Sequence, residues 1–193
     1  MNVQKLLDFI GSIEANGNYN AVYGSANATR DLSALTLNEV LEEQRQKIAA
    51  KRQSATGKYQ FIRATLAGLR DEMRLSGMER FTPDLQDKMA TRLLERRGLK
   101  NWMGGRIDDR QFANNLAREW ASLPVIETGR SYYAGDGLNK SLVTPEDVLA
   151  CLADVAESGV PDTSLPPLAP LSKPEKVAPP AARWPAWFWR IFG

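Results

Sequence analysis

The amino-acid sequence predicts a predominantly helical α+β domain with a small β or loop region, followed by a proline-rich C-terminal tail. Apolar residues recur at three- and four-residue spacing in several segments, and helix-start signals stand before most of them. The alternation typical of a strand is confined to residues 16 to 27. Because helices and strands do not alternate along the chain, a parallel α/β sheet is disfavoured. From the periodic segments we expect at least six helices.

The first predicted helix covers residues 2 to 14 and has Glu14 at its C-terminal end. Its apolar stripe consists of Val3, Leu6, Leu7, Ile10 and Ile13. The segment that follows is rich in Gly, Asn and Tyr, which favours a small hairpin or an irregular loop. Thr36 and Glu39 fit a capping box, so a second helix should begin there and run to about Ala50.

Three later helices have clearly marked beginnings. Thr82 and Pro83 combine a cap with a proline at the first helical position, and Gly98 should end that helix. Asp108 can cap the next helix, and Thr144 repeats the start signal before the last one. The apolar patterns of these regions place two tryptophans in the core, namely Trp102 and Trp120.

Composition narrows the possible functions. The chain has 193 residues, enough for one well-buried domain, and a net charge of +2 without a basic stripe, so no nucleic-acid partner is expected. It contains no histidine, which excludes Ser-His-Asp and Cys-His catalysis and removes the commonest nitrogen ligand of zinc. We expect neither a metal nor a cofactor. Cys151 is the single cysteine and stands among apolar residues, so it should be a buried, inert thiol.

The chain divides near residue 160. Residues 1 to 160 are predicted to form the domain, and residues 161 to 180 a polyproline-like linker, because eight of the 11 prolines lie at Pro161 or beyond. The last segment, residues 181 to 193, is too short to cross a bilayer. Its aromatic side chains should contact a membrane surface or a partner protein, or else fold back onto the domain. They are Trp184, Trp187, Phe188, Trp189 and Phe192.

Four short segments occur in an order that resembles phage endolysins of the lambda-lysozyme type, over roughly residues 5 to 125. They are Glu14, Gly57-Lys58-Tyr59-Gln60, Phe81-Thr82-Pro83 with Gln86-Asp87, and Trp120-Ala121-Ser122-Leu123-Pro124. The run Ser131-Tyr132-Tyr133-Ala134-Gly135 is similar to the wider lytic transglycosylase and goose-type lysozyme superfamily. The resemblance implies a lysozyme-like, two-lobed fold. It also implies cleavage of the β-1,4 bond between N-acetylmuramic acid and N-acetylglucosamine in peptidoglycan glycan strands.

Glu14 is the candidate catalytic residue. A leaving glycosidic oxygen needs a proton as positive charge builds on the sugar, so the reaction needs a carboxylic acid that stays protonated near neutral pH. The negative end of the helix dipole and partial burial by the following tyrosine-rich loop would both disfavour the ionised form of Glu14. The alternative is an ordinary exposed glutamate at a helix end.

Five further residues are predicted to bind the glycan. Tyr59 and Gln60 follow a glycine turn, where a hydroxyl and an amide can point into a groove, and Ser54 would support that turn or touch substrate. Tyr132 and Tyr133 would form the far wall. The corresponding alternatives are a half-buried Tyr59, a simple loop role for Ser54 and ordinary aromatic contacts for the tyrosine pair.

The first acid after Glu14 is Asp31, which is later than a water-positioning aspartate would be expected in a hydrolytic phage lysozyme. A single glutamate favours a lytic transglycosylase, in which the muramic 6-hydroxyl attacks internally. A hydrolytic lysozyme that uses Asp31, Glu39 or Glu42 is one alternative, and a non-catalytic wall-binding virion module is another. Ala15 also replaces the glycine that normally follows the glutamate in lambda-type relatives, which puts the local loop geometry in question.

The N-terminus lacks the basic region, long apolar run and cleavage site of a secretory signal. We therefore expect synthesis in the cytoplasm without a signal peptide, and action on the bacterial wall in the periplasm. Lysis release, virion delivery and secretion remain open as routes to the wall.

Overall fold

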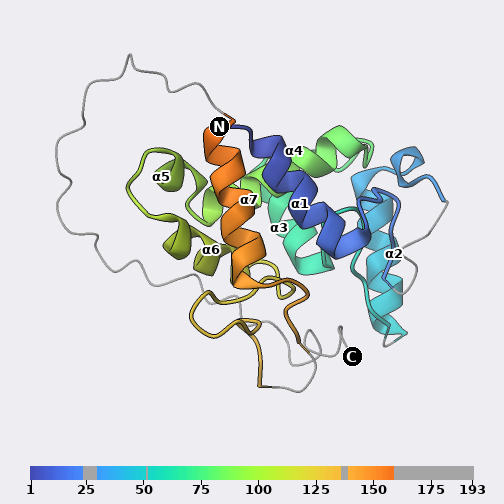
Figure 1. Ribbon diagram of the computed structural model, residues 1–193. Helices are drawn as coiled ribbons and strands as arrows, with labels where there is room; N and C mark the ends of the chain where they lie inside the picture. The colour runs from blue at the N-terminus through green and yellow to red at the C-terminus, as the bar shows by residue number, and fades with distance from the viewer. Residues whose placement is uncertain (24–29, 51, 136–138, 159–193) are drawn as a thin grey trace, which may run out of the picture.

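The computed structural model describes residues 1–23, 30–50, 52–135 and 139–158. Within these ranges it contains seven α-helices and one short 3-10 helix, η1 (Figure 1). Their bounds are α1 (Val3–Ala15), η1 (Leu32–Ala34), α2 (Leu37–Ala49), α3 (Arg63–Glu72), α4 (Pro83–Arg96), α5 (Leu99–Met103), α6 (Asp109–Ala117) and α7 (Pro145–Glu157). The predicted helical class is confirmed, and both the linker and the aromatic tail lie outside the described residues.

The helices begin where the sequence places their caps. Thr36 accepts from the amide of Glu39, whose carboxylate accepts from the amide of Thr36 in return, and this capping box opens α2. Thr82 caps α4 ahead of Pro83, and Asp108 caps α6. Each cap satisfies backbone N–H groups that have no partner inside the helix, so each fixes where its helix starts.

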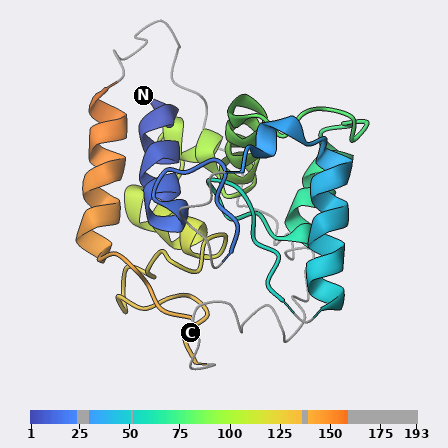
Figure 2. The ribbon, with the colours of Figure 1, turned by 90° about the vertical axis from the view of Figure 1, so that its right-hand side faces the viewer.

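The helices form two groups with α4 between them. α1 lies beside α7, and α7 also packs on α6, so these helices with α5 make one lobe (Figures 1 and 2). α2 packs on α3 at the opposite side of the molecule from α7 (Figure 2). α4 contacts both α1 and α5. This is the two-lobed arrangement that the sequence predicts.

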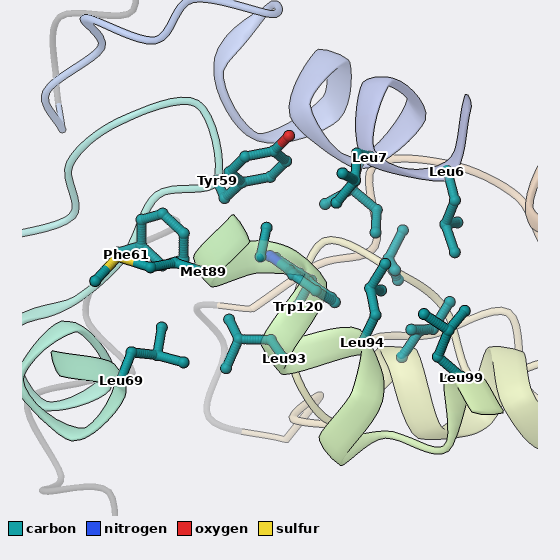
Figure 3. Close-up of a cluster of buried hydrophobic side chains, with 14 of the residues drawn as sticks. Leu6, Leu7, Tyr59, Phe61, Leu69, Met89, Leu93, Leu94, Leu99 and Trp120 are labelled. Atoms are coloured by element: carbon teal, nitrogen blue, oxygen red, sulfur yellow. The ribbon is translucent and has the colours of Figure 1, made fainter. Parts of the chain in front are cut away.

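A continuous core joins the two lobes. Leu69 of α3, Met89 and Leu93 of α4, and Trp120 meet there (Figure 3). Trp102 is also buried and stacks on Phe112, with ring centroids 4.8 Å apart. Both tryptophans are only 4 % exposed, which confirms their predicted place in the core.

The β component consists of isolated bridges within the described residues. Val22 pairs with Thr56, and Thr56 pairs with Phe61. Residues 16–23 therefore pair with the turn that begins near Ser54 and form no hairpin among themselves; residues 24–29 lie outside the described part of the chain. Among the described residues, no helix has the length and apolar character needed to cross a membrane.

Candidate active site

Glu14 occupies the last turn of α1, where the chain leaves the helix. Asn16 adopts a left-handed conformation (φ 51°), and its N–H bonds back to helical carbonyls, which ends α1 and turns the chain into the following loop. The Glu14 side chain is partly buried. Its Oε1 accepts a hydrogen bond from the hydroxyl of Ser122, a buried residue that follows α6.

Burial raises the pKa of Glu14 from the ordinary value of 4.5 to about 7, although the Ser122 hydroxyl partly opposes this shift by stabilising the carboxylate. One neutral donor compensates little of the hydration that an ionised carboxyl loses on burial. Glu14 therefore exchanges its proton near neutral pH. A carboxyl in this state can act first as an acid and then as a base.

The loop after Glu14 is bonded to the turn that carries Gln60. The amide of Gly57 donates to the carbonyl of Ala21 (2.7 Å), and the amide of Tyr23 donates to the carbonyl of Ala55 (2.9 Å). Gly57 has a φ of +81°, and a Cβ there would meet the Gln86 side chain. The turn thus needs glycine for both its conformation and its packing.

Gln60 is held in a strained but supported position. It adopts a φ of 48°, which is uncommon for a residue with a side chain, and its Nε2 donates to the carbonyl of Gly57 at 2.8 Å. The side chain remains partly exposed. The role of Gln60 in glycan binding stays a prediction from the sequence.

Tyr59 is 2 % exposed, and its hydroxyl turns toward α1 (Figure 3). The hydroxyl donates to Asp87 Oδ1 at 2.5 Å, and Tyr19 donates to the same carboxylate at 2.9 Å. Burial, then the hydrogen bond and charge of Asp87, raises the pKa of Tyr59, so the phenol stays protonated. This enclosed position differs from the groove contact that the sequence predicts.

Lys58 extends the same network toward α1. Its side chain crosses Gly11, where a Cβ would clash with it, and its Nζ lies 2.7 Å from Asp8 and 3.1 Å from the Tyr19 hydroxyl. Burial alone would lower the pKa of Lys58, but the hydrogen bonds to Asp8 and Tyr19 outweigh it and raise the pKa. The ammonium also lies over the Tyr19 ring. These contacts fasten the turn to α1.

The other predicted binding residues lie in different surroundings. Ser54 is fully buried, and its hydroxyl has no hydrogen-bond partner among the described residues. Tyr132 is 49 % exposed and meets Tyr133 edge to face, while the Tyr133 hydroxyl donates to the carbonyl of Arg118 at 2.7 Å. The structure thus brings Glu14 together with Ser122, and it places the two tyrosines in a second cluster with Arg118. The predicted tail contacts lie outside the described residues.

The acids considered as second carboxylates are engaged elsewhere. Asp31 caps η1 through Ser33, and Glu39 belongs to the capping box of α2. Glu42 bonds Arg45 and then Gln46, and these hydrogen bonds lower its pKa to about 2. All three are solvent-exposed or surface residues, and no hydrogen bond between any of them and Glu14 occurs in the part of the chain that the structure describes.

Sequence reasoning did not single out three polar residues that contact the predicted site residues, namely Ser122, Asp87 and Arg118. Ser122 and Asp87 both stand in segments that carry the resemblance, but no local pattern shows that a hydroxyl 108 positions from Glu14 reaches its carboxyl. Arg118 lies in no motif that points to a binding site.

Cys151 is half-buried against the core, and burial raises the pKa of its thiol to about 11, as expected for an inert cysteine.

Residues 10–144, which include Glu14, the Gly57 turn and Ser122, match the family model described as Endolysin. No curated protein and no solved structure matches the chain.

Proposed function

The chain belongs to the endolysin family, the phage enzymes that degrade the bacterial cell wall, and on that premise we propose that it is a muramidase with Glu14 as its catalytic residue. The bond cleaved is the β-1,4 bond between N-acetylmuramic acid and N-acetylglucosamine. The observation that carries the proposal is the partly buried Glu14 carboxyl, whose pKa near 7 suits it to proton transfer at neutral pH.

We further propose that the reaction is a lytic transglycosylation. Glu14 donates its proton to the glycosidic oxygen as the bond from that oxygen to C1 of the muramic residue breaks. The Glu14 carboxylate then accepts the proton of the muramic 6-hydroxyl as the hydroxyl oxygen bonds to C1. This second step closes a 1,6-anhydro ring and restores the acid, so one carboxyl serves both steps.

The engagement of Asp31, Glu39 and Glu42 in structural hydrogen bonds supports a single-carboxyl mechanism. Hydrolysis would need a base that orients water, and the candidate acids already serve as caps or ion-pair partners. Ser122 assists by positioning: its hydroxyl fixes one Glu14 oxygen and leaves the other for the substrate.

Substrate contacts are assigned to Gln60, Tyr132 and Tyr133, because these predicted binding residues retain exposed surface. Tyr59 positions Gln60 without contacting the glycan, because its hydrogen bond to Asp87 holds the turn that carries Gln60. For Ser54, full burial favours support of the turn over contact with the glycan. The membrane or docking role of the aromatic tail stays a prediction from the sequence.

Mass spectrometry of the fragments released from purified peptidoglycan tests the mechanism. We expect muramic ends with a 1,6-anhydro ring, which are one water lighter than reducing ends. Reducing ends would establish hydrolysis and return attention to Asp31. Fragments cut at an amide bond would contradict the muramidase proposal altogether.

A further inference from the structure

A polar groove of about 420 Å³ runs along α6, away from the residues that contact Glu14. Charged and amide side chains line it, among them Arg110, Gln111, Asn114, Arg118 and Glu127. Polar walls of this kind suit a charged or strongly hydrogen-bonding ligand better than an apolar one.

The carboxylates of the groove already have partners. Asp108 accepts from the amide of Gln111 as the cap of α6. Glu127 accepts from Asn114 at 2.8 Å and from Arg110 at 3.3 Å. The guanidinium of Arg118, in contrast, has no carboxylate partner within the residues that the structure describes. The groove therefore offers one uncompensated positive charge.

Two side chains bond the backbone of Arg118, and its guanidinium contacts an aromatic ring. Its carbonyl accepts from the Tyr133 hydroxyl at 2.7 Å and from Arg97 at 3.2 Å. Glu119 neutralises Arg97 through an ion pair of 2.7 Å, so the charge of Arg97 is already matched. The Arg118 guanidinium lies over the Tyr132 ring, 5.3 Å from its centroid. The ring attracts the cation, and the N–H groups of the Arg118 guanidinium make no hydrogen bond or ion pair within the described residues.

We infer that this groove binds the acidic peptide stem of peptidoglycan, with Arg118 donating to a peptide carboxylate. The inference rests on the proposed function, which makes peptidoglycan strands the substrate. A carboxylate matches the paired N–H donors at the edge of a guanidinium, and the exposed side-chain amide of Gln111 can bond the peptide backbone. The exposed Tyr132 ring contacts Arg118 and can contact the sugar that carries the stem.

Titration of a free stem peptide into the full-length protein tests this site without any need for cleavage. The probe is L-alanyl-γ-D-glutamyl-diaminopimelyl-D-alanine, followed by calorimetry. We expect Arg118→Gln to bind at least about tenfold more weakly than the wild type, because a charge-assisted hydrogen-bond pair is lost. Arg118→Lys should be intermediate, since it keeps the charge but loses the planar fork.

Arg106→Gln is the matched control. Arg106 is also exposed and also lacks a carboxylate partner among the described residues, but it does not line the groove. This variant should bind the peptide as the wild type does. Equal binding by wild type and Arg118→Gln, or no binding by the wild type, would overturn the inference.

Cleavage of glycan strands stripped of their peptides separates this inference from the proposed function. We expect the wild type and Arg118→Gln to cleave stripped strands equally, and Arg118→Gln to be slower only on intact peptidoglycan. Equal slowing on both substrates would place Arg118 in glycan binding and overturn the peptide site. Failure of the wild type to cleave stripped strands would count against the proposed function, while the peptide titration would still decide the site.

Discussion

Glu14 and Asp87 are carboxyl groups on two neighbouring helices, α1 and α4, and they differ in the hydroxyl groups that donate hydrogen bonds to them. Asp87 receives the hydroxyls of Tyr59 and Tyr19. Glu14 receives only the hydroxyl of Ser122 within the described residues. Asp87 thus has two hydroxyl donors, whereas Glu14 has one, and burial raises the pKa of Glu14 to about 7.

The comparison distinguishes a carboxylate that holds the Gly57 turn in place from the carboxyl that we propose to be catalytic. The Asp87 network ties the Gly57 turn to α1 and α4, because Lys58 and Tyr59 reach both helices from adjacent positions. Glu14 takes no hydrogen bond from that network: among the described residues its carboxyl accepts from Ser122, and burial raises its pKa.

The largest effect on stability should come from Glu14→Gln at alkaline pH. Between pH 4.5 and about 7 the folded state keeps the Glu14 proton while the unfolded state releases it, so the free energy of unfolding of the wild type falls as pH rises. Above pH 7 the loss should reach about 3 kcal/mol. Glutamine does not ionise, so the variant avoids this loss.

Urea unfolding of both proteins at pH 4 and pH 8 measures this difference. The two free energies of unfolding should be similar at pH 4, and the variant should be the more stable protein at pH 8. A wild type whose stability relative to the variant does not change with pH would show that Glu14 is solvated and has an ordinary pKa.

Substitution of Tyr59 and of Gln60 should have smaller effects, which fall on stability in the first case and on turnover in the second. Tyr59→Phe removes a buried donor to Asp87 and should lower the free energy of unfolding by about 1–2 kcal/mol, with turnover per folded molecule nearly unchanged. Gln60→Ala should lower turnover and leave the free energy of unfolding nearly unchanged, because the Gln60 side chain is partly exposed and bonds only its own turn. Urea unfolding and peptidoglycan clearing, measured on both variants, provide the comparison. Loss of turnover in folded Tyr59→Phe would contradict this expectation and favour the prediction from the sequence, in which the Tyr59 hydroxyl contacts the glycan.

The smallest effect should come from Ser122→Ala. The Ser122 hydroxyl stabilises the Glu14 carboxylate, so its removal should raise the Glu14 pKa further and move the alkaline limb of activity upward by less than about one pH unit. Ser131→Ala is the matched control, because Ser131 is also buried but its hydroxyl accepts from the amide of Tyr133. A pH profile that moves equally in both variants would remove Ser122 from the site.

Local signals in the sequence predict most of the helices. Thr36, Thr82, Asp108 and Thr144 all cap the helices that they were expected to start. The exceptions have physical reasons: α3 begins after Ile62, which provides no side-chain cap, and α5 is only five residues long.

The sequence-based site prediction uses local features alone. Glu14 is proposed from its place at a helix end and Gln60 from the glycine turn before it, and both assignments stay predictions. The bond from Ser122 and the burial of the Tyr59 hydroxyl against Asp87 depend on tertiary packing, since these partners lie 108 and 28 positions apart. A single sequence does not reveal contacts between residues so far apart. Polar residues in a motif can also stabilise the fold without taking part in the reaction.

The most direct test of the account is the turnover of purified peptidoglycan by Glu14→Gln beside Glu157→Gln. Glu157 also ends a helix, α7, but it is exposed, so it serves as the matched control. Circular dichroism should show that both variants are folded. We predict that Glu14→Gln loses about 100- to 10,000-fold in rate, because an amide cannot donate the catalytic proton, while Glu157→Gln keeps wild-type turnover. Comparable turnover by folded Glu14→Gln and the wild type would contradict the assignment of Glu14 as the catalytic acid.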